Sequence, residues 1–370
     1  MKSLYVIFFL SIFVIGCGQS QFTEANYGLT PSANVDDEEL KLIHELIKDF
    51  PPNTEIAIGF TQDDVTYYYG VRRQEDDLIY IENQNAVFEA GSISKVFTAT
   101  LLASMVHDNL LSLDDPINEK LGIRFNDERA ISFQQLSNHT SGMPRLPSNL
   151  EKYARTSPDN PYKDYDAEAL LYYLENDLAL NQDPGLKYEY SNLGTGLLGH
   201  ILSIIADNSY DDLLKERVFA PYAMKHSSTL KNEVADKLVI GLDNSGQPTS
   251  NWDLASLKGA GAVLATAEDL MFFAQAHFDS SDDVLTLTRE VTFTVNDNLD
   301  MALGWHVLKN KSVNPVHWHN GGTGGYRSSL AVDVKAKRAV VVLSNVSAFN
   351  RKSGKIDELC FELLNRMEDD

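Results

Sequence analysis

The sequence predicts an α+β fold whose sheet is assembled from the two ends of the chain. Short runs rich in β-branched and aromatic residues occur before position 91 and return after position 304. Between them, from about 92 to 251, the apolar residues follow mainly helical periodicity. A helical block between two groups of strands is typical of an α+β protein with one composite sheet.

The composition indicates an acidic globular protein. The 370 residues are 43% hydrophobic, which is enough to bury a substantial core. The chain has 53 acidic and 31 basic residues, and its formal net charge is −22. Such a charge repels phosphate backbones, so we expect no nucleic-acid partner.

The first residues have the features of an export signal. Lys2 precedes an apolar run over 4–15 that is too short to span a bilayer comfortably. The run ends in Val-Ile-Gly-Cys, which resembles the lipobox of bacterial lipoproteins, and an ordinary signal peptide is the alternative. We therefore expect a signal peptide over 1–16, lipidation of Cys17 and a polar linker over 17–35. The mature protein would be exported to the cell envelope and held at the membrane by its lipid.

The N-terminal part of the expected sheet follows an amphipathic helix over 36–50. This helix has acids in its first turn, one apolar stripe and two prolines at its end. The β-rich runs over 56–60 and 65–70 are separated by a polar turn and predict a hairpin. A further strand is expected over 78–81.

Helices in the middle region and strands in the last third complete the predicted fold. The helical patterns cover 96–107, 167–174, 197–206 and 211–218. The later strands are expected at 305–308, 329–333 and 339–344, followed by a closing amphipathic helix over 355–367.

These elements predict one catalytic domain. The sheet region would comprise 36–90 and 252–370, and the mainly helical region 91–251. Cys360 lies in the apolar pattern of the last helix, so we expect a buried thiol that forms no disulfide.

A serine and a lysine at the start of the first middle-region helix form the first candidate site. Ser92 and Lys95 are three residues apart, so on a helix the lysine amine can reach the serine hydroxyl. Apolar residues after Lys95 favour the neutral amine, which can take a proton from serine. The helix N-terminus would favour developing negative charge. The structural alternative is a helix cap at Ser92 and a lysine that reaches solvent.

Tyr190, Ser191 and Asn192 form a polar segment ahead of a predicted helix. A tyrosine beside a serine-lysine pair can act as a proton shuttle. An asparagine amide can donate to a substrate carbonyl and accept from an amide N–H. The alternative is an aromatic loop anchor followed by a helix cap.

Four glycines within the five residues 321–325 follow His319 closely and suggest that the backbone approaches a ligand there. Backbone N–H groups of this segment can supply one arm of an oxyanion hole, with the N–H of Ser92 as the other. A flexible glycine-rich loop is the alternative. His317 and His319 would share a strand face, but no cysteine or carboxylate completes a ligand set, so we expect no metal and no other cofactor.

The order of these motifs resembles that of the serine β-lactamase and penicillin-binding protein family. S-x-x-K at Ser92 is followed by Tyr-x-Asn at Tyr190 and by His-x-Gly at His319. Tyr-Ser-Asn in place of S-D-N is similar to the class C β-lactamase branch and its D,D-peptidase, D-aminopeptidase and esterase relatives. Further segments that resemble this branch are 88–98, 139–144, 259–270 and 303–305. The segment 136–144 is expected to form a structural turn near the site.

The resemblance covers about 36–367 and implies the β-lactamase/transpeptidase-like fold, an antiparallel sheet flanked by N- and C-terminal helices. It implies that Ser92 is the acylated nucleophile and that Lys95 and Tyr190 move its proton. Asn192 would orient the substrate amide, and the N–H groups of Ser92 and Gly322 would form the oxyanion hole.

The third motif departs from that of β-lactamases, which carry lysine where this chain has His319. A fixed cation there helps to hold the substrate carboxylate, whereas histidine is charged only partly near neutral pH. Related D,D-peptidases and esterases also show His-x-Gly, here His319 to Gly321. Arg327 is a candidate supplementary cation for substrate binding.

We therefore expect a serine hydrolase that works through an acyl-enzyme on Ser92. Its substrates would be β-lactam amides or D-amino-acid peptides of the peptidoglycan type. The alternatives are a carboxylesterase of the same fold and a penicillin-binding sensor that stays acylated.

Overall fold

A computed structural model of the chain describes residues 29, 35–62, 65–118 and 120–367. The expected signal peptide over 1–16 and the lipidation site Cys17 lie outside the described residues. Among those that are described, no helix is both long enough and apolar enough to cross a bilayer.

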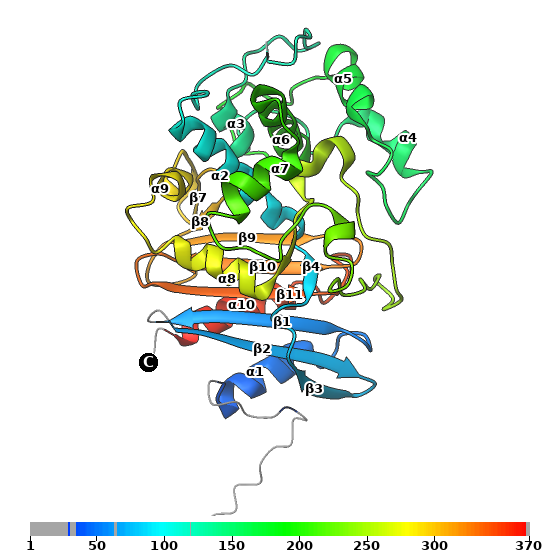
Figure 1. Cartoon of the computed structure of the whole chain (residues 1–370), viewed down its shortest axis with the longest axis vertical. Helices are drawn as coiled ribbons and strands as arrows, with labels where there is room; N and C mark the ends of the chain where they lie inside the picture. The colour runs from blue at the N-terminus through cyan, green and yellow to red at the C-terminus, as the bar shows by residue number, and fades with distance from the viewer. Residues whose placement is uncertain (1–28, 30–34, 63–64, 119, 368–370) are drawn as a thin grey trace, which may run out of the picture.

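The fold is built on an antiparallel sheet of nine strands in the order β3-β2-β1-β11-β10-β9-β8-β7-β6 (Figure 1). The strands from the N-terminal part of the chain are β1 (Glu55–Gln62), β2 (Val65–Gln74) and β3 (Asp77–Ile81). Those from the C-terminal part are β6 (Phe293–Asn296), β7 (Leu299–Met301), β8 (His306–Leu308), β9 (Val316–Gly322), β10 (Arg327–Asp333) and β11 (Arg338–Ser344).

The two ends of the chain meet in the middle of this sheet. Strand β1 pairs with β11 antiparallel, with Ile56 opposite Ser344 and Phe60 opposite Val340. The predicted composite sheet is therefore confirmed, and the hairpin expected from 56–60 and 65–70 is the pair β1 and β2.

Two helices from the chain ends cover one face of the sheet. They are α1 (Asp37–Ile47) and α10 (Lys355–Arg366). Asp36 and Glu39 form a capping box at the start of α1, so its first N–H groups are satisfied locally. Ile56 and Ile58 of β1 are buried in the same apolar cluster as these helices. Cys360 is buried, as predicted, and is a free thiol among the described residues.

The other face of the sheet packs on α8 (Ala267–Ala276) and α2 (Ser94–His107). Ala57 of β1 belongs to this second cluster, because alternate residues of a strand point to opposite faces. Helix α2 is buried on nearly every side, and the rings of Phe97 and Phe273 lie 4.8 Å apart between it and α8.

The middle region is helical, as predicted. Its helices are α3 (Phe133–Ser137), α4 (Glu151–Ala154), α5 (Ala167–Asn176), α6 (Asn192–Ala206) and α7 (Tyr210–Leu214). Short 3-10 turns include η1 (Gly91–Ile93), η2 (Ser148–Leu150), η4 (Lys231–Glu233) and η5 (Ala255–Ala260), and α7 continues into a π-helical turn, η3 (Lys215–Phe219). Figure 1 shows these helices gathered at one end of the molecule, with the sheet between them and α1.

A two-stranded sheet leads the chain into this helical region. It pairs β4 (Val87–Glu89) with β5 (Leu264–Thr266). The turn η1 follows β4 directly and places Ser92 between the small sheet, the large sheet and α2.

Several elements of the C-terminal half were not predicted from the sequence. They are β5, β6, β7, α8 and α9 (Asp283–Arg289). The strands among them have only three or four residues, too few to show a period of two. The start of α8 did carry a signal, because the Thr266 side chain caps the helix and two acids follow in its first turn.

Candidate active site

Ser92 lies in a short 3-10 turn that ends where α2 begins. The turn η1 starts after Ala90, and no side chain caps either η1 or α2. The alternative role of Ser92 as a helix cap is therefore excluded. Gly91 has a φ of +54°, and a Cβ there would lie 2.5 Å from the amide nitrogen of Gly322. Only glycine lets this turn approach β9 so closely.

Lys95 is in the first turn of α2, with its side chain directed inward. The residue is 0% exposed, which excludes the alternative of a lysine reaching solvent. Its Nζ donates to the Ser92 Oγ at 3.1 Å and to the carbonyl of Ala260 at 2.7 Å. No carboxylate forms an ion pair with Lys95 in the part of the chain that the structure describes. The amine is thus held against the serine hydroxyl by two oxygens that carry no net charge.

Burial is the main cause that holds the pKa of Lys95 well below its usual value of 10.5, and the positive charge of Arg145 adds to the effect. A buried lysine without a counter-charge favours its neutral form. A neutral amine has a lone pair that can accept the proton of the Ser92 hydroxyl. This arrangement can turn an otherwise weak serine into a nucleophile.

Tyr190 packs directly against this pair. The Lys95 Nζ lies 4.9 Å from the centroid of the Tyr190 ring. Burial raises the pKa of Tyr190, while a hydrogen bond with Ser92 and the charge of Arg145 oppose the rise. The phenol therefore keeps its proton at neutral pH, and its hydroxyl can pass a proton between the serine and a leaving group.

Helix α6 begins immediately after Tyr190. The side chain of Ser191 caps the helix by accepting the N–H of Gly194 at 2.8 Å. Asn192 is the first residue of α6, five residues earlier than the sequence predicted. Among the described residues, its side-chain Oδ1 is buried and has no hydrogen-bond partner. That oxygen can accept an amide N–H from a substrate.

Strand β9 brings the third motif beside Ser92. A Cβ on Gly321 would lie 1.9 Å from the carbonyl oxygen of Ala90, so β9 and the turn of Ser92 are in direct contact. The Ser328 Oγ on β10 donates to the same carbonyl at 2.8 Å. The amide of Gly322 thus lies close to the serine turn, where an oxyanion hole requires it. The alternative of a flexible glycine loop does not hold for Gly321 and Gly322, which are part of β9.

Three histidine rings surround Tyr190. Their centroids lie 4.5 Å (His139), 6.4 Å (His306) and 6.2 Å (His319) from that of the tyrosine. Burial lowers the pKa of His306 to about 4 and holds those of His139 and His319 well below 6.5. All three are neutral near pH 7. The partial charge expected for His319 is therefore wrong, because its ring is too well buried.

Arg327 does not join this group. It begins β10 opposite Gly322, and its guanidinium hydrogen-bonds to Asp357 of α10. Asn320, which points to the same face, also donates to Asp357, at 2.9 Å. His319 and Ser328 point to the other face, toward Ser92. The expectation that Arg327 binds substrate is corrected: the period of two along the strands directs it to the α10 face.

A family model described as Beta-lactamase matches residues 54–362. The chain belongs to the beta-lactamase family. The match contains the serine turn, α2, the start of α6 and β9, so every residue of the site described above lies within it.

Curated relatives cover most of this beta-lactamase family chain. Penicillin-binding protein 4 of Amycolatopsis lactamdurans is 27% identical over an alignment of 286 residues that covers 70% of this chain and 72% of that protein. The D-alanyl-D-alanine-carboxypeptidase/endopeptidase AmpH of Escherichia coli is 24% identical over 304 residues, 75% and 77% of the two chains.

Solved structures share the fold. A class C beta-lactamase from Rhodobacter sphaeroides superposes with a TM-score of 0.72 at 19% identity, over 89% of this chain and 99% of that one. An octameric penicillin-binding protein homologue from Pyrococcus abyssi gives 0.74 at 20% identity, over 88% and 76%. The predicted β-lactamase/transpeptidase-like fold is confirmed.

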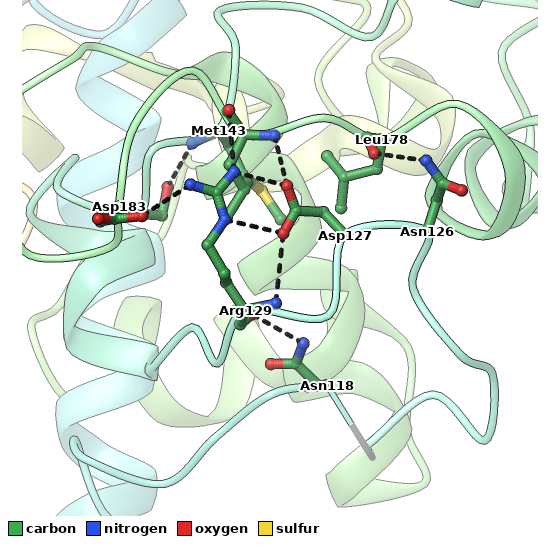
Figure 2. A network of polar contacts seen from close by, with 9 residues as sticks. Asn118, Asn126, Asp127, Arg129, Met143, Leu178 and Asp183 are labelled. Atoms are coloured by element: carbon green, nitrogen blue, oxygen red, sulfur yellow. Dashed lines mark hydrogen bonds and ion pairs between the residues drawn. The ribbon is translucent and has the colours of Figure 1, made fainter.

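A polar network supports the segment that carries Tyr190. Figure 2 shows Arg129 between Asp127 and Asp183. The Nη2 of Arg129 lies 2.6 Å from an Oδ of Asp127, and its Nη1 lies 2.9 Å from an Oδ of Asp183. Asp127 also accepts the N–H of Leu180 at 3.0 Å. Further contacts tie the same segment to the loop over 139–145, since the N–H of Glu189 donates to the carbonyl of His139 at 2.8 Å. The segment 136–144 begins in the last residues of α3, and the rest of it turns beside the site, as predicted.

Sequence reasoning missed four residues of this beta-lactamase family site. They are His139, Arg145, Tyr188 and His306. Tyr188 hydrogen-bonds to the Nε2 of His306 at 2.9 Å. His139 and Arg145 lie in or next to a segment that was assigned only a structural turn, and nothing in the pattern shows that their side chains reach Tyr190. No group of three potential metal ligands occurs among the described residues.

Proposed function

We propose that the protein is a serine hydrolase that forms an acyl-enzyme on Ser92, with β-lactam amides or D-amino-acid peptides as substrates. One observation carries the proposal. Lys95 is fully buried without a counter-charge, and its amine lies 3.1 Å from the Ser92 hydroxyl. A cell-envelope location, with the chain exported and lipidated at Cys17, is proposed from the sequence of the first 17 residues.

In the acylation step, the Ser92 Oγ attacks the acyl carbon of the substrate, and its proton passes to the neutral amine of Lys95. The carbonyl oxygen takes the electron pair and is stabilised by the N–H groups of Ser92 and Gly322. Each such donor is worth about 2.7–4 kcal/mol in the transition state. The tetrahedral intermediate then collapses, the bond to the leaving nitrogen breaks, and that nitrogen receives a proton from Tyr190, which Lys95 replenishes.

In the deacylation step, water attacks the ester of Ser92 and gives up a proton to the amine of Lys95. The ester bond breaks, the proton returns to the Ser92 Oγ, and the acid is released. Asn192 supports the proposal because its unpartnered Oδ1 can hold the amide N–H of an acyl side chain in both steps. No oxidant, reductant or cofactor is needed for this cycle.

The test is a substrate panel on the wild type, Ser92→Ala and Ser245→Ala, whose serine lies in an exposed loop. The panel contains a chromogenic cephalosporin, a D-Ala-D-Ala peptide and a short p-nitrophenyl ester. We expect turnover of at least one nitrogen-acyl substrate and a fall of about 10⁴-fold or more in Ser92→Ala alone.

Other results would change the assignment. Turnover of the ester alone would replace the proposal with the carboxylesterase alternative. A stable penicillin adduct on Ser92 without turnover, seen by intact mass, would identify an acylated sensor. Equal activity of the wild type and Ser92→Ala would contradict all three.

A further inference from the structure

Arg145 is an exposed cation at the edge of the site, and neither the motifs nor the proposed mechanism uses it. It follows Pro144, at the end of the turn that carries His139. Its guanidinium carbon lies 5.0 Å from the centroid of the Tyr190 ring. The guanidinium therefore stacks on the residue that is proposed to move the proton.

The backbone of Arg145 is fixed to the start of α6. Its carbonyl accepts the N–H of Asn192 at 3.0 Å and that of Leu193 at 3.1 Å. Both donors belong to the first turn of the helix, which has no internal partner for them. The cation and the amide of Asn192 are thus held side by side, while the guanidinium end stays open to solvent.

Arg145 forms no ion pair with a carboxylate in the described part of the chain. Other arginines near the site do form such pairs, Arg129 with Asp127 and Arg327 with Asp357. The chain has 53 acidic residues, yet Arg145 stacks on an aromatic ring and pairs with no described carboxylate. The N–H donors of its guanidinium are therefore available to bind an anion. Its planar donors match the geometry of a carboxylate.

Among the described residues, Lys95 and His319 of the inner site supply no cation that could bind a substrate carboxylate. The amine of Lys95 and the ring of His319 are both fully buried and favour their neutral forms. The third motif therefore offers no fixed cation, and Arg327 is engaged on the opposite face of the sheet.

We propose that Arg145 is a specificity-determining residue that binds a carboxylate in the acyl part of the substrate. The acyl side is favoured because the Arg145 carbonyl accepts the N–H of Asn192, whose unpartnered Oδ1 is proposed to hold the amide N–H of the acyl side chain. The inference rests on the proposed function, since it concerns the same acyl-enzyme chemistry. It adds the substrate class: acyl donors that carry a negative charge beyond the reacting carbonyl.

In the competing hypothesis, Arg145 acts only through the ring of Tyr190 and does not bind the substrate. A cation over the ring stabilises the phenolate and would help the reaction of every substrate alike. The two roles differ in one observable, because only carboxylate binding changes the ratio between charged and uncharged substrates.

The experiment compares kcat/KM for mono-p-nitrophenyl adipate and p-nitrophenyl hexanoate, whose acyl chains both have six carbons. Acylation of Ser92 by carbenicillin and benzylpenicillin, which differ by a carboxylate in the acyl side chain, is followed by intact mass. We expect the charged-to-uncharged ratio to fall about tenfold to a hundredfold in Arg145→Ala and to recover partly in Arg145→Lys. The wild-type ratio should also fall as salt is added.

Arg155→Ala is the matched control, because Arg155 is also exposed but pairs with Glu151 at 2.6 Å, away from Tyr190. It should keep the wild-type ratio. An unchanged ratio in Arg145→Ala, with or without an equal loss for both substrates, would overturn the inference and leave the proposed function intact. Failure of the wild type to react with any of the four compounds would overturn both.

Discussion

Lys95 and Arg327 are two cations near the same serine turn, on opposite faces of the sheet, with opposite surroundings. Lys95 is fully buried, and among the described residues its amine hydrogen-bonds to two uncharged oxygens and to no carboxylate. The Arg327 side chain is 19% exposed and pairs with Asp357, which is 20% exposed. Burial without a counter-charge makes Lys95 a neutral base, whereas the carboxylate lets Arg327 stay charged and hold α10 to the sheet.

A cation near a serine is therefore not evidence of catalysis by itself. The presence or absence of a carboxylate decides whether burial produces a base or an ion pair. Replacing each cation by methionine, which has a similar length and no charge, separates the two roles.

The two substitutions should differ most in their effect on the catalytic rate. Lys95→Met removes the group that is proposed to take the proton from Ser92, so we expect kcat/KM to fall about 10³-fold or more. Arg327→Met should stay within about threefold of the wild type, measured per folded molecule by active-site titration with an acylating agent. A comparable loss in both variants would show that Arg327 serves the reaction after all.

The next effect is on stability. Arg327→Met leaves Asp357 with the Asn320 amide as its remaining partner in a mostly buried site, so we expect the free energy of unfolding to fall by about 2–3 kcal/mol. Urea denaturation measures this loss. Arg366→Met is the control, because its pair with Glu38 is exposed and should contribute under about 1 kcal/mol. Equal losses in the two variants would contradict the difference in burial.

The smallest effect is a pH dependence of stability, in which the buried amine of Lys95 destabilises the folded protein at low pH. Because the folded-state pKa of Lys95 lies below its usual 10.5, folding releases a proton between those two values. Wild-type stability therefore rises with pH in that window, relative to a variant without the amine. We expect Lys95→Met to gain stability over the wild type at pH 6 and to lose part of that gain at pH 9, in parallel urea titrations. A gain that does not change with pH would show that Lys95 is charged in the folded protein.

The sequence predicted the site residues that lie at the ends of secondary structure elements. Ser92 and Tyr190 are each next to a helix start, and His319 lies in a strand that ends in two glycines. Local patterns indicate such positions. The sequence also placed the strands that became β1, β10 and β11, because each has a run of β-branched or apolar residues long enough to show its type.

The features that the sequence did not predict depend on strand register and on side-chain direction. Four residues separate Gly322 from Arg327, and nothing in them indicates which face of β10 the arginine occupies, since a shift of one residue would reverse it. Arg145 and His306 come to Tyr190 only through the packing of segments that lie far apart in sequence. No periodicity within either segment can reveal such a contact.

The close contact between Gly91 and the amide of Gly322 has a consequence for the order of folding. The chain between positions 92 and 322 must be synthesised before the serine turn meets its strand. Strand β11, which joins β10 to β1, is made later still. Contacts of such long sequence separation form slowly. The nascent chain should therefore lack the proposed hydrolase activity until its last strands are in place, so that this activity would report complete folding.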